Sequence, residues 1–498
     1  MRTDKSIKNI GVMFVTQTIT LILEFASRTI FIKNLGAEYL GLNGLFSNIL
    51  NTLSLAEMGI GAAISYALYK PIAEVDREQI KSILAFYKRC YFNIGIFILI
   101  AGIFLIPFLP FLIKDKITVQ VDITSVYLCF LLNSVIGYFF AHKRIIIDDS
   151  QNKRITAVID FSSKTAISIL QIFILIKFKN YMWFLYAKIL GTLIASIVIL
   201  FFADKKYPYI REKSSILDRE KRKKIWNNVS ILFFSKLGAI GVLNTDFILI
   251  SAFIGIAEVG IYSNYTLIIN VVSIFVMLFV QGADASIGNA IATLEKDRLY
   301  AVFKKISFLI FCISGFSCVC LINLLNPFIE FWIGEEYVFS GFFVFFISLN
   351  FFFTQNRWLT LTFKQNAGLF RPDMYKPLIE VAFNLILSIL LLKYFGILGI
   401  VIGTLCNTFF ICIWVEAYIV FKHLFKISVR EYVFKYVLFI CPLIISCVFC
   451  LYINSFLDDF IFKFFITLFF TTLIYFLFFF RTEEFKYFVE LFRKMVKK

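Results

Sequence analysis

The chain of 498 residues is 60% hydrophobic and carries a formal net charge of +17, and its mean hydropathy is +0.84. Soluble domains are about 45–50% apolar, so a water-soluble fold would leave a large excess of apolar surface exposed. The apolar runs are about 20 residues long and do not alternate, which excludes a transmembrane β-barrel. The composition therefore predicts an all-α polytopic membrane protein.

The first apolar run follows a short basic segment. Arg2, Lys5 and Lys8 resemble the positive end of a signal peptide, but the run after them is long enough to span a membrane. This run also contains Glu24 and Arg28 and lacks a small-residue cleavage site. We expect it to be the first membrane helix of the mature protein.

Hydropathy and the positions of polar and glycine breaks predict about fourteen spans. Their approximate cores are 9–32, 41–68, 90–113, 122–141, 155–176, 181–203, 227–254, 259–287, 306–329, 339–363, 377–392, 396–421, 436–454 and 464–480. With the first residue inside, most of the 50 Lys and Arg residues fall in cytoplasmic tails and loops. We therefore expect a multi-pass plasma-membrane protein with both termini in the cytoplasm, and we assign the positive charge to topology rather than to nucleic-acid binding.

A strongly basic stretch, 204–226, interrupts the chain between the sixth and seventh predicted spans. Within it, Ile216, Leu217 and Ile225 predict an amphipathic segment on the inner membrane surface. Because six spans return the chain to the same side, two lobes in a parallel repeat are expected. We predict an N-terminal six-helix lobe over 1–203, this cytoplasmic linker, a C-terminal six-helix lobe over 227–421, and two additional helices with a basic tail over 422–498.

Five cations lie inside otherwise apolar spans. An Arg at the bilayer centre costs roughly 2.5–3.5 kcal/mol on insertion scales, so such residues usually face a bundle interior or a water-filled cavity. The planar guanidinium also donates two hydrogen bonds to a phosphate. We predict a central cavity that binds an anionic ligand through Arg28, Lys164, Lys188, Lys236 and Arg357.

Three carboxylates within spans are candidates for orienting these cations or for coupling transport to an ion: Glu24, Glu57 and Asp246. The competing interpretation is internal pairing, because Glu24 and Arg28, and likewise Asp160 and Lys164, are four residues apart on one helix face. Both interpretations are open at this point. Three further carboxylates, Asp284, Glu380 and Glu416, lie nearer to inner helix ends, where water is expected to solvate them.

Motifs for catalysis or metal binding are lacking in the sequence. It contains no nucleotide-binding P-loop and no Ser/His/Asp arrangement in a soluble context. The ten cysteines and two histidines have no zinc-ligand spacing. We expect no metal, no cofactor and no enzymatic activity, and a carrier that is ion-coupled or driven by a partner.

The most specific pattern lies in 34–71, which reads NLGAEYLGLNGLF from Asn34, LSLAEMGIG from Leu53 and LYKP from Leu68. It resembles the polysaccharide flippases of Gram-positive capsule and exopolysaccharide clusters, which belong to the multidrug/oligosaccharidyl-lipid/polysaccharide exporter superfamily. A second stretch, with Asp246 followed by Val259-Gly260-Ile261, resembles the junction of the seventh and eighth helices in that family. The resemblance extends over roughly the first 420 residues.

This resemblance implies two six-helix lobes around a central cavity, with two further helices. It also implies that an undecaprenyl-pyrophosphate-linked oligosaccharide moves from the inner to the outer leaflet by alternating access, with membrane lipid, glycosyltransferases and a polysaccharide polymerase as partners. Arg28 matches a first-helix arginine that serves the cavity in related flippases. Two alternatives are an ion-coupled multidrug or metabolite exporter of the same fold, which favours an acidic, aromatic cavity, and a membrane scaffold for glycosyltransferases.

Overall fold

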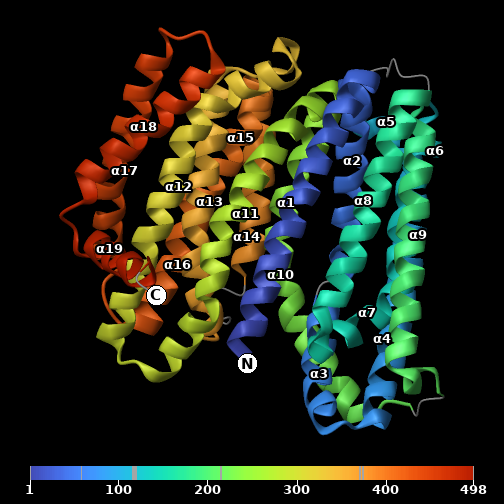
Figure 1. Cartoon of the computed structure of the whole chain (residues 1–498). Coiled ribbons are helices and arrows are strands. Elements are labelled where there is room, and N and C mark those ends of the chain that lie inside the picture. Colours follow the sequence, from blue (N-terminus) through green and yellow to red (C-terminus); the bar gives the residue numbers. More distant parts are fainter. Residues whose placement is uncertain are drawn as a thin grey trace. The chain divides into compact units, whose positions relative to one another are not determined.

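The computed structural model describes residues 2–57, 59–114, 121–212, 216–369, 372 and 375–496. Within these ranges the side chains of residues 2–17 and 231–244, and of a few single positions, lie outside the description. The described part is almost wholly helical and contains no β-strand. The chain forms two compact units, Met1–Ile261 and Tyr262–Lys498 (Figure 1).

The first unit consists of ten helices and the start of an eleventh. They are α1 (Arg2–Leu35), α2 (Ala37–Leu53), α3 (Ile60–Glu74), α4 (Arg77–Leu105), α5 (Leu109–Leu112), α6 (Ile123–Phe140), α7 (Arg144–Ile147), α8 (Lys153–Phe178), α9 (Tyr181–Lys206), α10 (Arg219–Phe253) and α11 (Ile256–Thr293). Side-chain caps fix several helix starts, because they satisfy backbone N–H groups that have no partner within the helix. The Asp122 carboxylate, for example, accepts hydrogen bonds from the backbone N–H groups of Thr124 and Ser125 at the start of α6.

The second unit contains the rest of α11 and the remaining helices. They are α12 (Lys296–Ile333), α13 (Gly341–Asn366), α14 (Lys376–Phe395), α15 (Ile397–Cys406), α16 (Trp414–Ile419), α17 (Arg430–Asn454), α18 (Phe460–Phe479) and α19 (Glu483–Val496). A π-helical segment, Asn407–Ile413, joins α15 to α16 into one long helix. The amphipathic α19 packs Phe485 and Phe488 against an aromatic cluster that includes Phe308 and Phe479.

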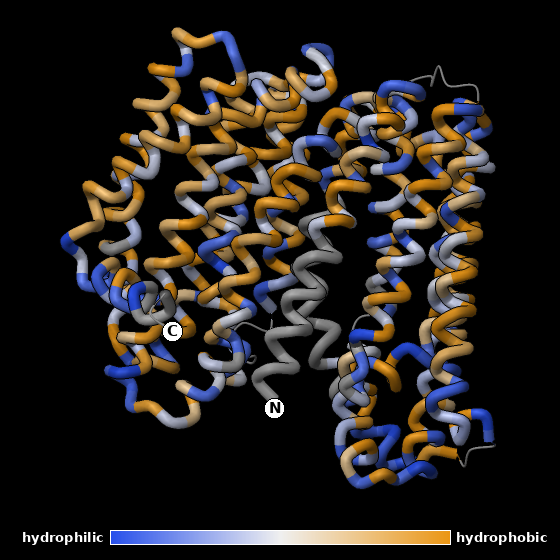
Figure 2. The backbone as a smooth tube through the Cα atoms, viewed as in Figure 1, coloured by the Kyte–Doolittle hydropathy of each residue, from blue (hydrophilic) through white to orange (hydrophobic). Residues whose placement is uncertain are grey.

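Each of the fourteen predicted cores coincides with a helix or a broken helix, and the prediction of an all-α membrane protein is confirmed. Ten helices in the described residues are long and apolar enough to cross a membrane, so the count of fourteen stays a prediction. In both units, hydrophobic residues run along the long helices, and hydrophilic residues gather at helix ends and turns (Figure 2). This distribution suits helices whose outer sides face lipid.

The second predicted span, 41–68, is wrong as a single helix. The chain leaves α2 at Leu53, forms a 3₁₀ turn over Ser54–Glu57 and starts α3 after Gly59. Gly59 has a φ of +89°, a left-handed conformation that glycine adopts without steric cost. The break between the first two predicted spans, 9–32 and 41–68, contains Gly36, which also has a φ of +89°.

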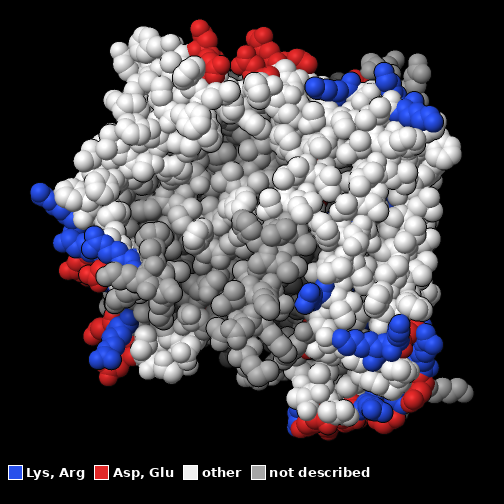
Figure 3. Space-filling view, in the orientation of Figure 1, with Lys and Arg blue, Asp and Glu red and all other residues white. Residues whose placement is uncertain are grey.

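The basic stretch between α9 and α10 is partly helical. Residues from Arg219 onward form the first turns of α10, which continues without interruption to Phe253. Exposed Lys and Arg side chains at the α3–α4 turn and after α9 gather at one end of the first unit (Figure 3). That this end faces the cytoplasm, as the positive-inside rule predicts, stays a prediction. The predicted lobe boundaries stay predictions; the two units of the structure divide later, after Ile261.

Candidate functional site

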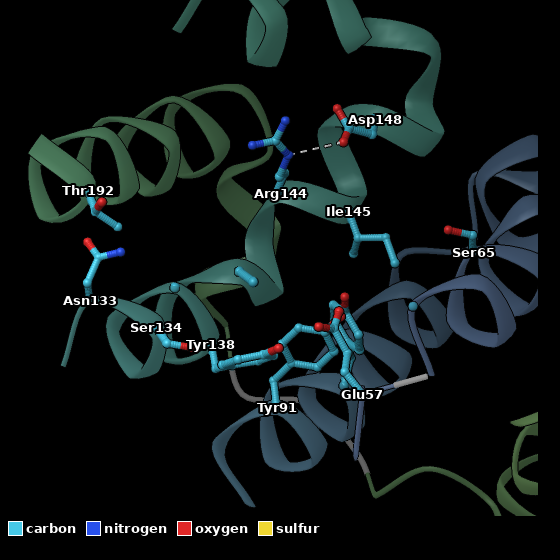
Figure 4. Close-up of a pocket in the computed structure, with 14 residues that line it drawn as sticks. Glu57, Ser65, Tyr91, Asn133, Ser134, Tyr138, Arg144, Ile145, Asp148 and Thr192 are labelled. Carbon is cyan, nitrogen blue, oxygen red and sulfur yellow. Dashed lines mark hydrogen bonds and ion pairs between the residues drawn. The ribbon is translucent and has the colours of Figure 1, made fainter. Parts of the chain in front are cut away.

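A cavity of about 590 Å³ lies within the first unit. Its walls come from the junction of α2 and α3, from α4, from the second half of α6, from α7 and from α9. Small-molecule sites are typically about 300–1,000 Å³, so the cavity has a suitable size for a ligand. Polar and aromatic side chains line it from three sides (Figure 4).

The first side carries a carboxylate and a row of tyrosines. Glu57 accepts a hydrogen bond from the Tyr91 hydroxyl. The ring centroids of Tyr87 and Tyr91 are 4.3 Å apart, and those of Tyr91 and Tyr138 are 5.9 Å apart. A Cβ atom at Gly61 would lie 3.5 Å from the Tyr91 hydroxyl. The break before α3 therefore places Glu57 against the tyrosines of α4 and α6.

The second side carries an arginine held by two carboxylates. Arg144 of α7 donates two parallel hydrogen bonds to Asp160 of α8, at 3.0 and 2.5 Å. Its Nε lies 3.5 Å from the carboxylate of Asp148, which also accepts a hydrogen bond from Thr156. Asp148 begins a π-helical segment, Asp148–Asn152, a local geometry that is frequent at functional sites.

The third side is uncharged. Asn133, Ser134 and Thr192 line it, and the Asn133 Oδ1 atom is buried without a hydrogen-bond partner among the described residues. A buried acceptor left unpaired costs about 1–3 kcal/mol. A ligand that donates a hydrogen bond to Asn133 would remove this cost.

The charge of the cavity differs from the predicted cationic pocket. Asp148 and Asp160 neutralise Arg144, and Glu57 forms no ion pair within the described part of the chain. The cavity is therefore acidic and aromatic. Such walls suit hydroxyl groups or a cation better than a pyrophosphate.

None of the predicted cations with a described side chain lines this cavity. Arg28 is half-buried on α1 and interacts with other residues. Lys164 is 61% exposed on α8, and its ammonium lies 3.9 Å from Glu24. The Lys188 ammonium on α9 lies 4.9 Å from the centroid of the Phe130 ring. The side chain of Lys236 lies outside the described residues.

The predicted pair between Asp160 and Lys164 is wrong. Asp160 binds Arg144 on the neighbouring α7 instead, and Lys164 lies beside Glu24 on α1. A guanidinium fork matches both oxygens of a carboxylate, whereas an ammonium acts as a point charge. The fork of Arg144 therefore occupies the carboxylate that the four-residue spacing had assigned to Lys164.

Arg357 belongs to a buried ionic cluster in the second unit. Its guanidinium donates to Glu416 at 2.9–3.1 Å and to Glu380 at 3.1 Å. Lys376 also binds both carboxylates. The side chains of Glu380 and Glu416 are only 4% and 1% exposed, so their expected solvation at helix ends is wrong. The cluster pairs two cations with two anions, which favours the internal-pairing interpretation for Arg357.

Of the predicted carboxylates, Glu57 lines the cavity. Glu24 lies beside Lys164, and Asp246 is buried on α10 and interacts with other residues. The analysis of the sequence missed several other lining residues, namely Tyr87, Tyr91, Asn133, Tyr138 and Arg144. A signal was present: Tyr91 lies four residues after Tyr87, and Tyr138 lies four residues after Ser134, so each pair shares a helix face. Charged residues alone do not reveal this pattern.

Comparisons with known proteins agree with this architecture. A family model described as "Polysaccharide biosynthesis protein" matches residues 6–283, more than half of the chain. No curated protein matched the sequence. The fold is similar to that of the lipid II flippase MurJ in an inward closed conformation, with a TM-score of 0.70 and 16% identity, over 94% of this chain and 97% of that one.

Two MATE transporters share the fold as well. An inward-facing MATE family transporter of the MOP superfamily gives a TM-score of 0.61 at 15% identity, over 82% of this chain and 98% of that one. The Vibrio cholerae MATE transporter VcmN gives 0.57 at 14% identity, over 85% and 97%. The fold is thus the one that MurJ and MATE family transporters share. By the match of the family model over more than half of its residues, the chain belongs to the polysaccharide biosynthesis protein family.

Proposed function

We propose that the protein is a flippase that moves an undecaprenyl-pyrophosphate-linked oligosaccharide from the inner to the outer leaflet of the plasma membrane. The observation that carries this proposal is the family match over residues 6–283. The shared fold supports it, because a lipid II flippase also has this fold. The transported unit would supply capsule or exopolysaccharide synthesis, with both termini of the protein in the cytoplasm.

A polar path is the physical requirement for this activity. The sugars and pyrophosphate cannot cross about 30 Å of hydrocarbon unaided, because each buried polar group without a partner costs several kcal/mol. The cavity in the first unit offers hydroxyl, amide and carboxylate groups inside an apolar bundle. The polyprenyl tail would stay in the bilayer beside the apolar helix faces while the head group crosses by alternating access.

The pyrophosphate needs cations that are free to change partners. Lys188 suits this role best, because its ammonium contacts a phenylalanine ring and forms no ion pair within the described part of the chain. Arg28, Lys164 and Lys236 complete the proposed set. We leave Arg357 out, because Glu380 and Glu416 already occupy its guanidinium. Glu24, Glu57 and Asp246 stay candidates for orienting the cations or coupling transport to an ion.

Deletion of the gene tests the proposal. Surface polysaccharide should disappear, and the lipid-linked unit should accumulate on the inner leaflet, where a non-permeant glycosidase or lectin added outside whole cells cannot reach it. Complementation with the intact gene should restore both. Normal amounts of surface polymer in the deletion strain would overturn the proposal.

A second candidate is an exporter of organic cations with the same fold. The acidic and aromatic wall formed by Glu57, Tyr91 and Tyr138 favours it, because such walls attract cations. It predicts that deletion lowers resistance to cationic drugs and leaves surface polysaccharide unchanged. The two readouts in one deletion strain separate the two candidates.

A further inference from the structure

The cavity of the first unit has chemistry that fits neither a phosphate nor a purely cationic ligand. Glu57 forms no ion pair in the described part of the chain and repels phosphate, and Arg144, the arginine among the described lining residues, is already bound to Asp148 and Asp160. A bulky organic cation would, in turn, find Glu57 as the one lining carboxylate that no described arginine or lysine neutralises, and the Tyr91 hydroxyl already contacts it (Figure 4). A neutral ligand with many hydroxyl groups avoids both conflicts.

The hydrogen-bonding groups of the cavity match a sugar. A carboxylate offers about four lone-pair positions, and Tyr91 occupies one on Glu57, which leaves acceptors for adjacent sugar hydroxyls. The buried Oδ1 of Asn133 needs a donor. Ser134 and Thr192 add hydroxyl groups beside it.

The aromatic row supplies the apolar half of such a site. Tyr87, Tyr91 and Tyr138 form a continuous row with centroid separations of 4.3 and 5.9 Å. A pyranose ring has an apolar face of C–H groups, and tyrosines combine a broad apolar ring with a polar tip. The tyrosine rings therefore lie in the same cavity as groups that accept hydrogen bonds from sugar hydroxyls, and recognition of a sugar requires both.

We propose that this cavity is a sugar-binding pocket, which holds a pyranose ring of the glycan through Glu57, Asn133 and the tyrosine row. This inference rests on the proposed function and assigns the sugar part of the substrate to the first unit. The pyrophosphate binds elsewhere, at cations such as Lys188. The pocket would then select among glycans by their hydroxyl pattern.

Gly137 allows the pocket to be filled without disturbing its walls. It lines the cavity, and a Cβ atom added to it would have no heavy atom within 4 Å. Gly137→Leu should therefore place its side chain in the space meant for the ligand. Gly282 is a matched control, because it is also helical, has the same open surroundings and lies on α11 in the second unit. The corresponding variant is Gly282→Leu.

Binding is measured on the full-length protein in lipid nanodiscs by ligand-observed NMR. The probes are glucose, galactose, N-acetylglucosamine, N-acetylgalactosamine and rhamnose, with tetraphenylphosphonium and inorganic pyrophosphate for comparison. At least one sugar should bind, and pyrophosphate should displace it only poorly. Gly137→Leu should abolish that signal, and Glu57→Gln should weaken the affinity about tenfold, since a charged acceptor becomes a neutral one. Gly282→Leu should bind as the unchanged protein does.

Three results would overturn the inference: no sugar of the panel binds, sugar binding is unaltered in both cavity variants, or tetraphenylphosphonium binding depends on Glu57 while sugars do not compete. Thermal unfolding verifies that each variant is folded, and Asn133→Leu replaces Gly137→Leu if the latter is not. Different results would refute the sugar pocket and the proposed flippase function. Loss of surface polymer on deletion, together with no sugar binding, refutes the pocket alone, whereas sugar binding with normal surface polymer in the deletion strain refutes the flippase.

Discussion

Arg144 and Asp160 join α7 to α8 through two parallel hydrogen bonds of 3.0 and 2.5 Å. The helix α7 is only four residues long, Arg144–Ile147, and a 3₁₀ turn and a π-helical segment connect it to α6 and α8. The pair thus anchors a short element that forms one wall of the cavity. Its bidentate geometry distinguishes it from an ordinary surface ion pair.

The first prediction concerns this anchor. Asp160→Asn should lower the free energy of unfolding by about 1 kcal/mol, because the pair is partly exposed and solvent screens it. Arg144→Lys should cost a similar amount, since lysine keeps the charge but loses the fork. Thermal unfolding in detergent measures both. Lys70→Ala removes a single, highly exposed contact with Glu74 and should change nothing; equal effects of all three would contradict the prediction.

The second prediction concerns the carboxylate of the cavity. Glu57→Gln should reduce flipping of the lipid-linked unit about tenfold, because a neutral amide is a weaker acceptor than a carboxylate. Tyr91→Phe removes the hydroxyl that holds Glu57 and keeps the ring, so a smaller loss is expected. Surface polysaccharide in the complemented deletion strain reports both. Full activity of Glu57→Gln would exclude a role for the charge.

The third prediction concerns the ionic cluster of the second unit. Glu416→Gln should destabilise the protein by about 3–5 kcal/mol, because it leaves Arg357 and Lys376 with one buried carboxylate. The charge-balanced double variant Arg357→Met and Glu416→Leu should recover much of this loss, since replacing a buried pair by apolar residues is often neutral. Unfolding midpoints compare the variants. A double variant as unstable as Glu416→Gln would show that charge balance is not the cause.

The fourth prediction separates two lysines of the first unit. Lys188→Ala should reduce transport at least tenfold if its ammonium binds the pyrophosphate, and Lys188→Arg should retain most activity. Lys164→Ala should have a smaller effect, because Lys164 is largely exposed and its ammonium already lies beside Glu24. Flipping assays at matched protein levels measure the transport activity of these variants. Equal transport by Lys188→Ala and the intact protein would remove Lys188 from the site.

The fifth prediction concerns close packing between α2 and the start of α11 in the first unit. A Cβ atom at Gly41 would lie 1.9 Å from the backbone oxygen of Ile256, and one at Gly260 would lie 2.1 Å from that of Ala37. Gly41→Ala and Gly260→Ala should each cost about 1–3 kcal/mol, because the backbones must separate. Gly282→Ala, which has open surroundings, should be neutral or slightly stabilising. Unfolding midpoints that fall equally in all three would contradict this.

The positions of the helices could be predicted from the sequence because apolar length is a local property. The sixth predicted span, 181–203, corresponds to α9 (Tyr181–Lys206), and the break between the first two predicted spans contains the turn at Gly36. The break at Gly59 was missed, because apolar residues continue across it and hydropathy averages over them. Local composition thus locates a helix better than it locates a break inside one.

The partners of the charges could not be predicted, because they lie on different helices. Spacing of four residues identifies neighbours on one helix. In the structure, however, Asp160 binds Arg144, and Arg357 binds carboxylates that are 23 and 59 residues away in the sequence. Which helices pack together decides these contacts. Glu57 was predicted as a candidate because a carboxylate inside an apolar run is conspicuous, whereas the tyrosines beside it resemble ordinary core residues.

The left-handed glycine before α3 has a consequence for variation of this chain. At φ +89° a residue with a side chain is strained, so the direction in which α3 departs depends on a position that contacts no ligand. A homologue could keep every polar group of the pocket and still aim Glu57 elsewhere if that glycine were lost. Ligand preference in this family would then change through the course of the backbone as readily as through the chemistry of the walls.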